Sequence, residues 1–568
     1  MRSLSVSQKF TRRLLNTAVI SLLSGIVATL PARSADKIYF DYGPFGRSLP
    51  VSSLEAFAED GTVDADLAPY INRLPDDRQQ DFQRFLSTPL PTLSPNIPEA
   101  MGDPFALSQW LYTPIGETVL TGFGQMIETE SGENGQRAIR AAILLAAADP
   151  DGLSLLNIIR HYPTGGVRLN LQQIQVVART VTAGMETTDE LLSAAAQSAQ
   201  AAAVAEPTLD YSALPLLADN GSLAVEQRSL LLDDSQRDRT YPVDLYLPAN
   251  LSAVTGPIPV VVFSHGFGDT RRNPQAITAA QGLASNGFMV AVPEHIGSNK
   301  TYQDGLAQGL HSVTFEATEF IDRPLDIRFL LDTLEQKNSS EFQGRLQLEN
   351  VGMIGHSFGG YTALATAGGT VDINYLQQQC DLEAELGSND INVALLLACR
   401  ALELAEVPGA IQQLTDGSLG DDRIGFVFAL SPVSSLFGDT GLSTIQMPVV
   451  LMGGETDMAT PVALEQLIAF QGLTTPERYL YLAENISHSP ELTRLVLDVT
   501  SSSNNIVELF DENENTFSNL VVSLGIAHGK LHLLNDESYR PYLTAAYAEA
   551  ASVEPVNLYL LRSVPDGF

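Results

Sequence analysis

The sequence has few of the residues that metal-binding and nucleic-acid-binding proteins need. Only two cysteines and eight scattered histidines occur in 568 residues, so there is no Cys/His cluster of the zinc type, and we predict no metal or other cofactor. Lys and Arg number 32 against 67 Asp and Glu, which gives a net charge of −35. Phosphate backbones repel a chain this acidic, so we predict no nucleic-acid partner and interpret the charge as that of a soluble surface.

The composition is that of a folded protein rather than a disordered one. Apolar residues make up 44% of the chain and charged residues 17%, which are proportions typical of globular proteins. A length of 568 residues exceeds that of one compact domain, so the sequence predicts two or three domains.

The first 34 residues are typical of an export signal. Four basic residues precede an apolar run at 14–30, and Ala32 and Ser34 supply small residues at −3 and −1 for cleavage before Ala35. The run is slightly short for a membrane span, and an uncleaved anchor stays open as the alternative. No cysteine lies near the cleavage site, which argues against a lipoprotein. We expect export to the periplasm, a thylakoid lumen or the cell exterior, which are oxidising compartments.

Residues 35–205 are predicted to form a mainly helical N-terminal domain. An extended segment or short strand is expected at 38–45, and four prolines between 89 and 98 indicate a rigid connector. Helical patterns cover 51–57, 137–148, 153–161 and 190–205. We find no internal repeat and no catalytic constellation in this region. Its role stays open between packing, the gating of substrate and the binding of a partner.

The remaining domain, 206–568, is predicted to be an α/β domain. After a linker at 207–224, two strands separated by a polar turn predict an antiparallel edge hairpin at 229–232 and 241–248. Apolar runs typical of strands buried on both faces follow at 258–263, 288–292, 351–354, 425–430, 448–452 and 478–482. Helical patterns between them predict a mostly parallel sheet with helices on both faces. Active sites of such sheets lie beyond the carboxyl ends of the strands.

The motif Gly-His-Ser-Phe-Gly at 355–359 follows one of these predicted strands and precedes a helix-compatible segment at 361–367. Strand, G-x-S-x-G and helix are the context of a nucleophile elbow, a sharp turn that lifts a serine hydroxyl above the sheet. The flanking glycines remove side chains that would collide there. We therefore predict Ser357 as a nucleophile, with an ordinary turn and a buried serine as the alternative.

A serine nucleophile needs a base that accepts its proton and a third group that orients the base. Asp457 lies in a glycine-opened loop after the strand at 448–452, and we predict it as the orienting acid, with Glu455 as the alternative. His488 lies in the loop after the next strand and is predicted as the base. The chain order of serine, acid and histidine is that of α/β hydrolases.

Acyl transfer also needs hydrogen-bond donors for a developing oxyanion. The glycine-rich segment 263–268 follows a buried strand, and its backbone N–H groups can face an open site. We predict the backbone amides of Phe267 and Phe358 as the two donors, with a plain strand-to-helix turn as the alternative for this segment. Four other histidines are interpreted as structural: His265, His295, His528 and His532.

Three segments together resemble the plasma-type platelet-activating-factor acetylhydrolases and bacterial dienelactone-hydrolase-like esterases. They are 262–268 (VFSHGFG), Glu294-His295 and 355–360 (GHSFGG), and the resemblance covers about 225–568. It implies an α/β-hydrolase fold, carboxyl-ester hydrolysis without a metal, and the roles given above to Ser357, His488 and the two amides. Residues 35–200 resemble the uncharacterised N-terminal region that precedes such hydrolases in bacterial, chiefly cyanobacterial, proteins.

The chain departs from the acetylhydrolases at the position of the acid. Those enzymes place it soon after the strand that follows the nucleophile, whereas here that strand is followed by Ser431-Pro432, with no carboxylate. The acid is therefore expected after the next strand, at Asp457, as in dienelactone-type hydrolases. The substrate preference of the acetylhydrolases consequently transfers less directly.

An insertion of helical character is predicted at about 368–423, above the elbow, where such insertions often act as lids. It holds both cysteines of the chain, Cys380 and Cys399. In an exported protein we expect this pair to form a disulfide, with two free buried thiols as the alternative. The apolar run at 393–398 is expected to pack on the sheet, with an acyl-binding surface as the alternative.

The sequence therefore predicts a serine esterase that acts on small-molecule or lipid esters, phospholipid acyl esters included, through an acyl-enzyme. A transient contact with a membrane surface would accompany a lipid substrate. Two alternatives stay open: a non-catalytic binding protein on a hydrolase fold, and an acyltransferase or peptidase that uses the same triad. The natural ester and the oligomeric state are left open.

Overall fold

The computed structural model describes residues 34–42, 45–89, 102–207, 209–384, 392–489, 504–565 and 567–568. The expected export signal lies outside these residues except for Ser34, and most of the proline-rich connector lies outside them as well. In the part of the chain that is described, no helix is both long enough and apolar enough to cross a membrane.

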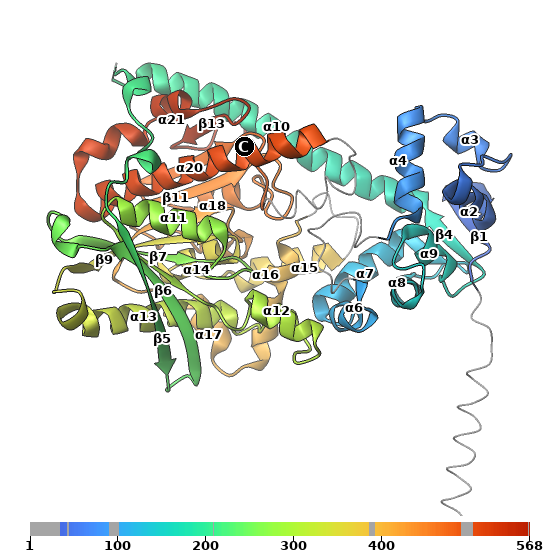
Figure 1. Cartoon of the computed structure of the whole chain (residues 1–568), viewed down its shortest axis with the longest axis horizontal. Coiled ribbons are helices and arrows are strands. Elements are labelled where there is room, and N and C mark those ends of the chain that lie inside the picture. The colour runs from blue at the N-terminus through green and yellow to red at the C-terminus, as the bar shows by residue number, and fades with distance from the viewer. Residues whose placement is uncertain are drawn as a thin grey trace, which may run out of the picture.

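Nine strands form the frame of the larger domain. They are β5 (Val225–Asp234), β6 (Arg239–Pro248), β7 (Ile258–Ser264), β8 (Met289–Pro293), β9 (Leu346–His356), β10 (Ile424–Leu430), β11 (Val449–Gly454), β12 (Arg478–Ala483) and β13 (Leu558–Leu561). Their order in the sheet is β13-β12-β11-β10-β9-β7-β8-β6-β5 (Figure 1). The six strands from β12 to β8 are parallel, whereas β13 and the β5–β6 hairpin run antiparallel to their neighbours at the two edges.

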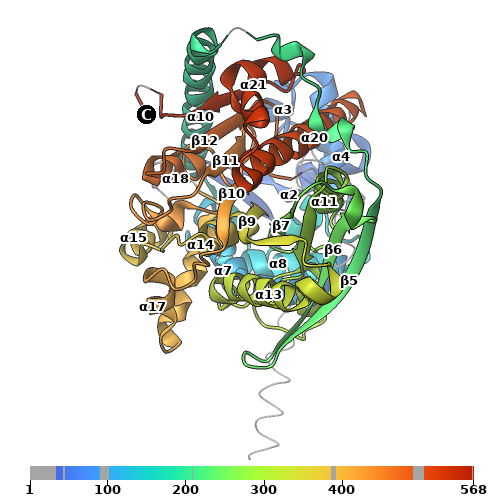
Figure 2. The same ribbon diagram turned by 90° about the vertical axis from the view of Figure 1, so that its left-hand side faces the viewer.

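Helices cover both faces of this sheet because its central strands are apolar on both sides. All seven residues of β7 are buried, and successive side chains alternate between two cores, so that Val262 packs into one and Phe263 into the other. The first core includes α13 (Glu319–Glu341) and α14 (Phe358–Thr366), and the second includes α11 (Pro274–Ser285) and α20 (Asn504–Leu534). Figure 2 shows α11 and α20 across the sheet from α13. The predicted α/β architecture is confirmed.

The edge next to β12 differs from the sequence prediction. The sequence places the last strand at 478–482, but β13 pairs with β12 beyond it, from Leu480 with Leu561 to Ala483 with Leu558. β13 is only four residues long and follows two helices and a turn. A run this short carries no period-2 pattern that distinguishes a strand from a loop.

The N-terminal unit is mainly helical, as predicted, but it also contains a four-stranded sheet. The strands are β1 (Lys37–Tyr42), β2 (Phe45–Pro50), β3 (Ile127–Thr129) and β4 (Gly166–Asn170), in the order β2-β1-β4-β3. Around them lie α2 (Val51–Asp60), α3 (Ala68–Ile71), α4 (Asp76–Ser87), α6 (Pro104–Leu111), α7 (Pro114–Met126), α8 (Gln136–Ala148), α9 (Leu155–Arg160) and α10 (Leu171–Ala205). The unit has its own hydrophobic core, to which both the helices and the sheet contribute.

The N-terminal unit contacts the larger domain at separate places (Figure 1). The long helix α10 packs against β13 and α21 (Ala545–Ala551), and the Glu206 carboxylate at its end accepts the backbone N–H groups of Ala545 and Ala546 at 3.0 and 2.9 Å. A carboxylate at a helix N-terminus stabilises that helix. Elsewhere α6 lies against α12 (Lys300–Ala307), and α7 lies against α16 (Leu395–Ala398).

The expected insertion lies between α14 and β10 and is helical where it is described. It comprises α15 (Ile373–Ala384), α16 and α17 (Ala410–Thr415), with a 3-10 segment at Cys399–Glu406. Cys380 of α15 and Cys399 are joined by a disulfide. The bridge joins two helical segments of the insertion that are separated by residues 385–398, of which 385–391 lie outside the described chain.

Candidate active site

The turn from β9 into α14 holds Ser357 in a backbone conformation that few non-glycine residues adopt. Its φ is 57° and its ψ is −118°. Such strain persists only where the surrounding structure fixes the backbone. Here the Ser357 N–H donates to the carbonyl of Leu430, at the end of the neighbouring β10, at 2.9 Å. The serine is therefore presented at the carboxyl edge of the sheet, which is the geometry of a nucleophile elbow.

The glycines of the motif are required by close approaches of backbone to backbone. A Cβ at Gly355 would overlap the carbonyl of Gly359, and a Cβ at Gly359 would overlap the carbonyl of Ser264 at the end of β7. Backbone atoms cannot move aside as a flexible side chain can, so neither overlap could be relieved by a change of rotamer. The spacing of G-x-S-x-G thus follows from how closely α14 approaches β9 and β7.

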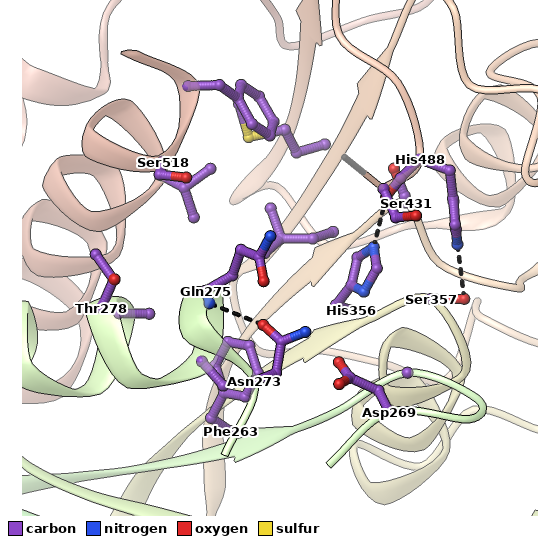
Figure 3. Close-up of a pocket in the computed structure, with 18 of the residues that line it drawn as sticks. Phe263, Asp269, Asn273, Gln275, Thr278, His356, Ser357, Ser431, His488 and Ser518 are labelled. Atoms are coloured by element: carbon purple, nitrogen blue, oxygen red, sulfur yellow. Dashed lines mark hydrogen bonds between the residues drawn. The ribbon is translucent and has the colours of Figure 1, made fainter. Parts of the chain in front are cut away.

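Ser357, His488 and Asp457 form a continuous chain of hydrogen bonds. His488 Nε2 lies 3.0 Å from Ser357 Oγ, and His488 Nδ1 lies 3.0 Å from Asp457 Oδ2. The exposed fraction is 8% for Ser357 and 3% for Asp457. Figure 3 shows the His488 ring directed at Ser357. The structure therefore brings together the three residues that the sequence analysis selects from the ends of β9, β11 and β12.

Asp457 is held in place by its own loop. Its Oδ1 accepts the backbone N–H groups of Ala459 and Thr460 at 3.0 and 2.8 Å, and its Oδ2 accepts the Thr460 hydroxyl at 2.8 Å. Burial raises the pKa of this carboxyl, but His488 and the hydrogen bonds outweigh burial and hold the pKa below its ordinary value. Glu455, the alternative acid, instead accepts the backbone N–H of Asn485 at 2.8 Å.

The bond to Asp457 decides which nitrogen of His488 carries the proton. Because a carboxylate only accepts, Nδ1–H is the donor, and Nε2 is left to accept the hydroxyl of Ser357. Burial lowers the pKa of His488, but the charge and hydrogen bond of Asp457 more than offset it, so the pKa lies above its ordinary value. The His488 imidazole is therefore oriented by Asp457 and has an increased affinity for a proton, as a general base requires.

His356, which the sequence analysis does not select, is a second contact of the His488 loop. Its Nε2 donates to the backbone carbonyl of His488 at 3.1 Å, as Figure 3 shows. Burial, together with the neighbouring His488, lowers the pKa of His356 to about 4, so this ring is neutral at pH 7. The residue that precedes the serine thus fixes the backbone of the residue that would act as base.

The loop after β7 lies against Ser357 from the other side. A Cβ built at Gly266 would lie 3.4 Å from Ser357 Cβ, and Phe267 lines the same cavity as the serine. Phe358 is the first residue of α14, so its backbone N–H has no partner within that helix. Of the two predicted oxyanion donors, Phe267 therefore lies on the loop that lines the cavity beside Ser357, and Phe358 follows Ser357 directly at the start of α14.

A cavity of about 410 Å³ opens beside Ser357 and His488. Figure 3 shows it passing His356 and Gln275 and reaching Thr278 and Ser518, which lie on α11 and α20. Apolar side chains contribute much of its wall: Phe263, Ala276, Ala279, Leu430, Met452, Phe517, Val521 and Val522. The space suits an uncharged group of moderate size next to the serine.

The four histidines interpreted as structural contact groups other than Ser357. His528 and His532 lie in α20, and His528 Nε2 and the Tyr481 hydroxyl are 3.1 Å apart within the core on that side of the sheet. His295 Nε2 and the hydroxyl of Ser264 are 2.8 Å apart, and the His295 backbone N–H donates to His265 Nε2 at 3.1 Å. These contacts fit the structural roles that the sequence analysis gives to them.

Comparison with protein families gives two matches, one in the N-terminal unit and one in the larger domain. Residues 34–170 match a family described as "Alpha/beta hydrolase of unknown function", and residues 235–371 match one described as "Putative esterase". The first match covers most of the N-terminal unit. The second includes the loop after β7 and the Ser357 turn, and ends before Asp457 and His488. No curated protein matches the chain.

The matches and the nine-stranded sheet agree on the class of protein. The chain has an α/β-hydrolase fold, preceded by a mainly helical unit. The esterase match supports an enzyme that hydrolyses ester bonds.

Proposed function

We propose that the protein is a serine hydrolase of carboxylic esters. The observation that carries the proposal is the unbroken chain of hydrogen bonds from Ser357 through His488 to the buried Asp457. The esterase match supports the reaction class. The hydroxyl, the base and the orienting acid supply its chemistry.

In this proposal the reaction proceeds through an acyl-enzyme. His488 Nε2 accepts the proton of Ser357 while Oγ attacks the ester carbonyl. The imidazolium then donates that proton to the leaving alcohol as the carbon–oxygen bond breaks. A water molecule repeats the two steps on the acyl-enzyme, and the carboxylic acid leaves as Ser357 regains its proton. Asp457 orients the imidazole and stabilises its charged form.

The negative charge of the tetrahedral intermediate falls on the former carbonyl oxygen. We assign the backbone amides of Phe267 and Phe358 as its hydrogen-bond donors, because Phe267 lines the cavity beside Ser357 and Phe358 follows Ser357 at the start of α14. Preorganised donors of this kind are worth about 10²–10³ in rate each. Since these are backbone groups, side-chain substitution at either position tests the assignment only indirectly.

The proposed substrates are carboxylic esters with uncharged acyl chains of short or medium length, lipid-derived and phospholipid acyl esters included. The apolar wall of the cavity, from Phe263 to Val521, would remove an alkyl group from water. The resemblance of the motifs to acetylhydrolases and dienelactone-type hydrolases supports the same class. A series of p-nitrophenyl esters of graded chain length measures the preference, and a rate that only increases up to palmitate would contradict it.

We also propose that the protein is exported. The basic and apolar pattern of 1–34 supports a cleaved signal, and the bond between Cys380 and Cys399 suits an oxidising compartment. N-terminal sequencing of the protein recovered from its native cell checks the site, since cleavage before Ala35 makes that residue the first. A chain that still begins at residue 1 in a membrane fraction would favour the anchor instead.

The proposed function is tested by labelling the intact protein with a fluorophosphonate and by assaying p-nitrophenyl butyrate. We expect stoichiometric labelling at Ser357, located by peptide mass spectrometry, together with loss of esterase activity. An unlabelled and inactive protein would instead indicate a binding protein on a hydrolase fold. Product analysis with an added alcohol separates hydrolysis from acyl transfer, and a peptide substrate tests for peptidase activity.

The pH dependence of kcat/KM follows from His488. Burial alone would lower its pKa, but Asp457 raises it above the ordinary 6.5. Only the neutral imidazole accepts the Ser357 proton, so we expect kcat/KM to rise with pH along a one-proton limb whose midpoint lies above 6.5. His356, with a pKa of about 4, is neutral across this range. Initial rates from pH 5 to 9 provide the measurement, and a midpoint below 6.5 would refute the assignment.

A further inference from the structure

Arg323 of α13 is a fully buried arginine whose guanidinium contacts the loop after β7. Its exposed fraction is 0%. Nη1 donates to the carbonyl of His265 at 2.8 Å, and Nη2 reaches the carbonyl of Gly266 at 3.4 Å. The Gly266 carbonyl also accepts a hydrogen bond from His265 Nδ1 at 2.9 Å. Two consecutive carbonyls of this loop are therefore drawn to the same side.

Because the peptide bond is planar, the contact of Arg323 with the Gly266 carbonyl also fixes the direction of the Phe267 N–H. In a trans peptide the carbonyl of one residue and the N–H of the next point in opposite directions. The carbonyl of Gly266 is held toward Arg323, so the N–H of Phe267 is turned away from the buried guanidinium. Gly266 itself lies close to the serine, because a Cβ built on it would be 3.4 Å from both Ser357 Cβ and His356 Nδ1. Since Phe267 and Ser357 line the same cavity, we infer that this N–H, turned away from Arg323, is directed into that cavity.

Arg323 also contacts the residue that carries the second proposed donor. The guanidinium carbon lies 4.2 Å from the centre of the Phe358 ring, which is itself fully buried. A cation over an aromatic face is attracted to it, more strongly when both are removed from water. One side chain therefore contacts both elements that supply the oxyanion amides, the loop after β7 and the start of α14.

The guanidinium is itself held rigidly. Ser298 Oγ accepts Nε and Nη2 of Arg323 at 3.1 and 2.7 Å and donates to Glu319 at 2.6 Å, and Glu319 lies 3.4 Å from Arg323 Nε. The carbonyl of Ser298 also accepts the N–H of Gly268, at 2.8 Å. Burial lowers the pKa of Arg323 to about 10, so it stays charged at neutral pH. Glu319 compensates the charge of the guanidinium. Ser298 contacts both partners, since its hydroxyl holds Arg323 and its carbonyl holds Gly268 of the loop after β7.

We propose that Arg323 is the positioning residue of the oxyanion site, which orients the Phe267 amide through the Gly266 carbonyl and supports Phe358 through its ring. The inference rests on the proposed function, because it assigns a role within that site. It goes beyond that function by identifying a residue that would touch neither substrate nor nucleophile and yet act selectively on the transition state.

The test compares Arg323→Lys with the unsubstituted protein. Lysine keeps the charge, but its single nitrogen cannot reproduce the planar fork whose three nitrogens contact two carbonyls and a hydroxyl. We expect kcat for p-nitrophenyl butyrate to fall about 10²-fold, as for loss of one oxyanion donor, with KM changed less than about twofold, since the ground state makes little use of the oxyanion donors. Inhibition by phenylboronic acid, which forms a tetrahedral adduct on the serine, should weaken by a similar factor.

Arg478→Lys is the matched control. Arg478 is half-buried, donates to the Phe470 carbonyl at 3.2 Å and lies with its guanidinium carbon 5.0 Å from the centre of the same ring, at the start of β12 and so at the opposite end of that strand from His488. We expect its kcat to stay within about twofold of the original. Thermal unfolding shows whether each variant is folded. If Arg323→Lys does not fold, Ser298→Ala replaces it, because that change only loosens the guanidinium; there kcat should fall about tenfold and boronate affinity with it.

Each outcome decides the inference. A parallel loss of kcat and boronate affinity, with KM preserved, supports it. An unchanged kcat, a change confined to KM, or a loss of kcat without a loss of boronate affinity overturns it. These results differ from failure of the proposed function, in which the unsubstituted protein itself hydrolyses no ester and takes up no fluorophosphonate.

Discussion

Replacing Ser357 by alanine is expected to abolish ester hydrolysis while leaving substrate binding almost intact. The change removes the atom that would attack the carbonyl, and no other hydroxyl is placed 3.0 Å from His488 Nε2 in the described residues. Loss of a serine nucleophile typically lowers kcat about 10⁵- to 10⁶-fold, because base, acid and oxyanion donors act only through it. The measurement is kcat and KM for p-nitrophenyl butyrate, with KM expected within about threefold of the original.

Ser518→Ala is a suitable control for this experiment. Ser518 lines the same cavity but belongs to α20, on the far wall from His488 (Figure 3). Its loss should change kcat by less than about twofold, since it takes part in no step of the proposed reaction. Equal rates for Ser357→Ala and the unsubstituted protein would show that the hydrogen-bonded chain is not the catalytic centre.

The central strands of the sheet are predictable because burial on both faces leaves a recognisable pattern in their sequences. β7 is buried on both faces, so it reads as an uninterrupted apolar run, and the turn after β9 is specified by its glycines. The small N-terminal sheet depends instead on pairing between distant segments, with Lys37 opposite Gly166. β3 has only three residues, all half-buried. No local pattern encodes such a pairing, so the sequence indicates the extended segment at 38–45 but not the strands that pair with it.

The same distinction explains what could be foreseen of the site. Ser357, Asp457 and His488 each follow a recognisable strand, and each has the residue type that its role requires. The bond from His356 to the His488 carbonyl depends on how near two loops lie, which only the fold determines. The burial of Arg323 could have been recognised from the sequence, because this charged residue lies on the apolar face of α13 beside Phe320 and Ile327. A charge at such a position needs a buried partner.

The substitution Asp457→Asn is expected to produce the second large effect, because it would favour the wrong tautomer of His488. The oxygen at Oδ1 accepts the N–H groups of Ala459 and Thr460, so the amide of asparagine would place its oxygen there and its NH₂ toward His488 Nδ1. Because an NH₂ group donates, Nδ1 would have to accept, and the imidazole proton would lie on Nε2. A protonated Nε2 cannot accept the proton of Ser357. We expect kcat to fall about 10³- to 10⁴-fold, with KM little changed.

The same substitution should also move the pH profile, which separates it from simple loss of structure. Without the carboxylate, burial remains as the dominant influence and lowers the pKa of His488, so the midpoint of the residual activity should shift to lower pH. Glu455→Gln is the matched control, because Glu455 lies in the same loop and contacts Asn485 instead. A loss in Glu455→Gln as large as in Asp457→Asn, or an unshifted midpoint in Asp457→Asn, would argue that the acid has been assigned to the wrong carboxylate.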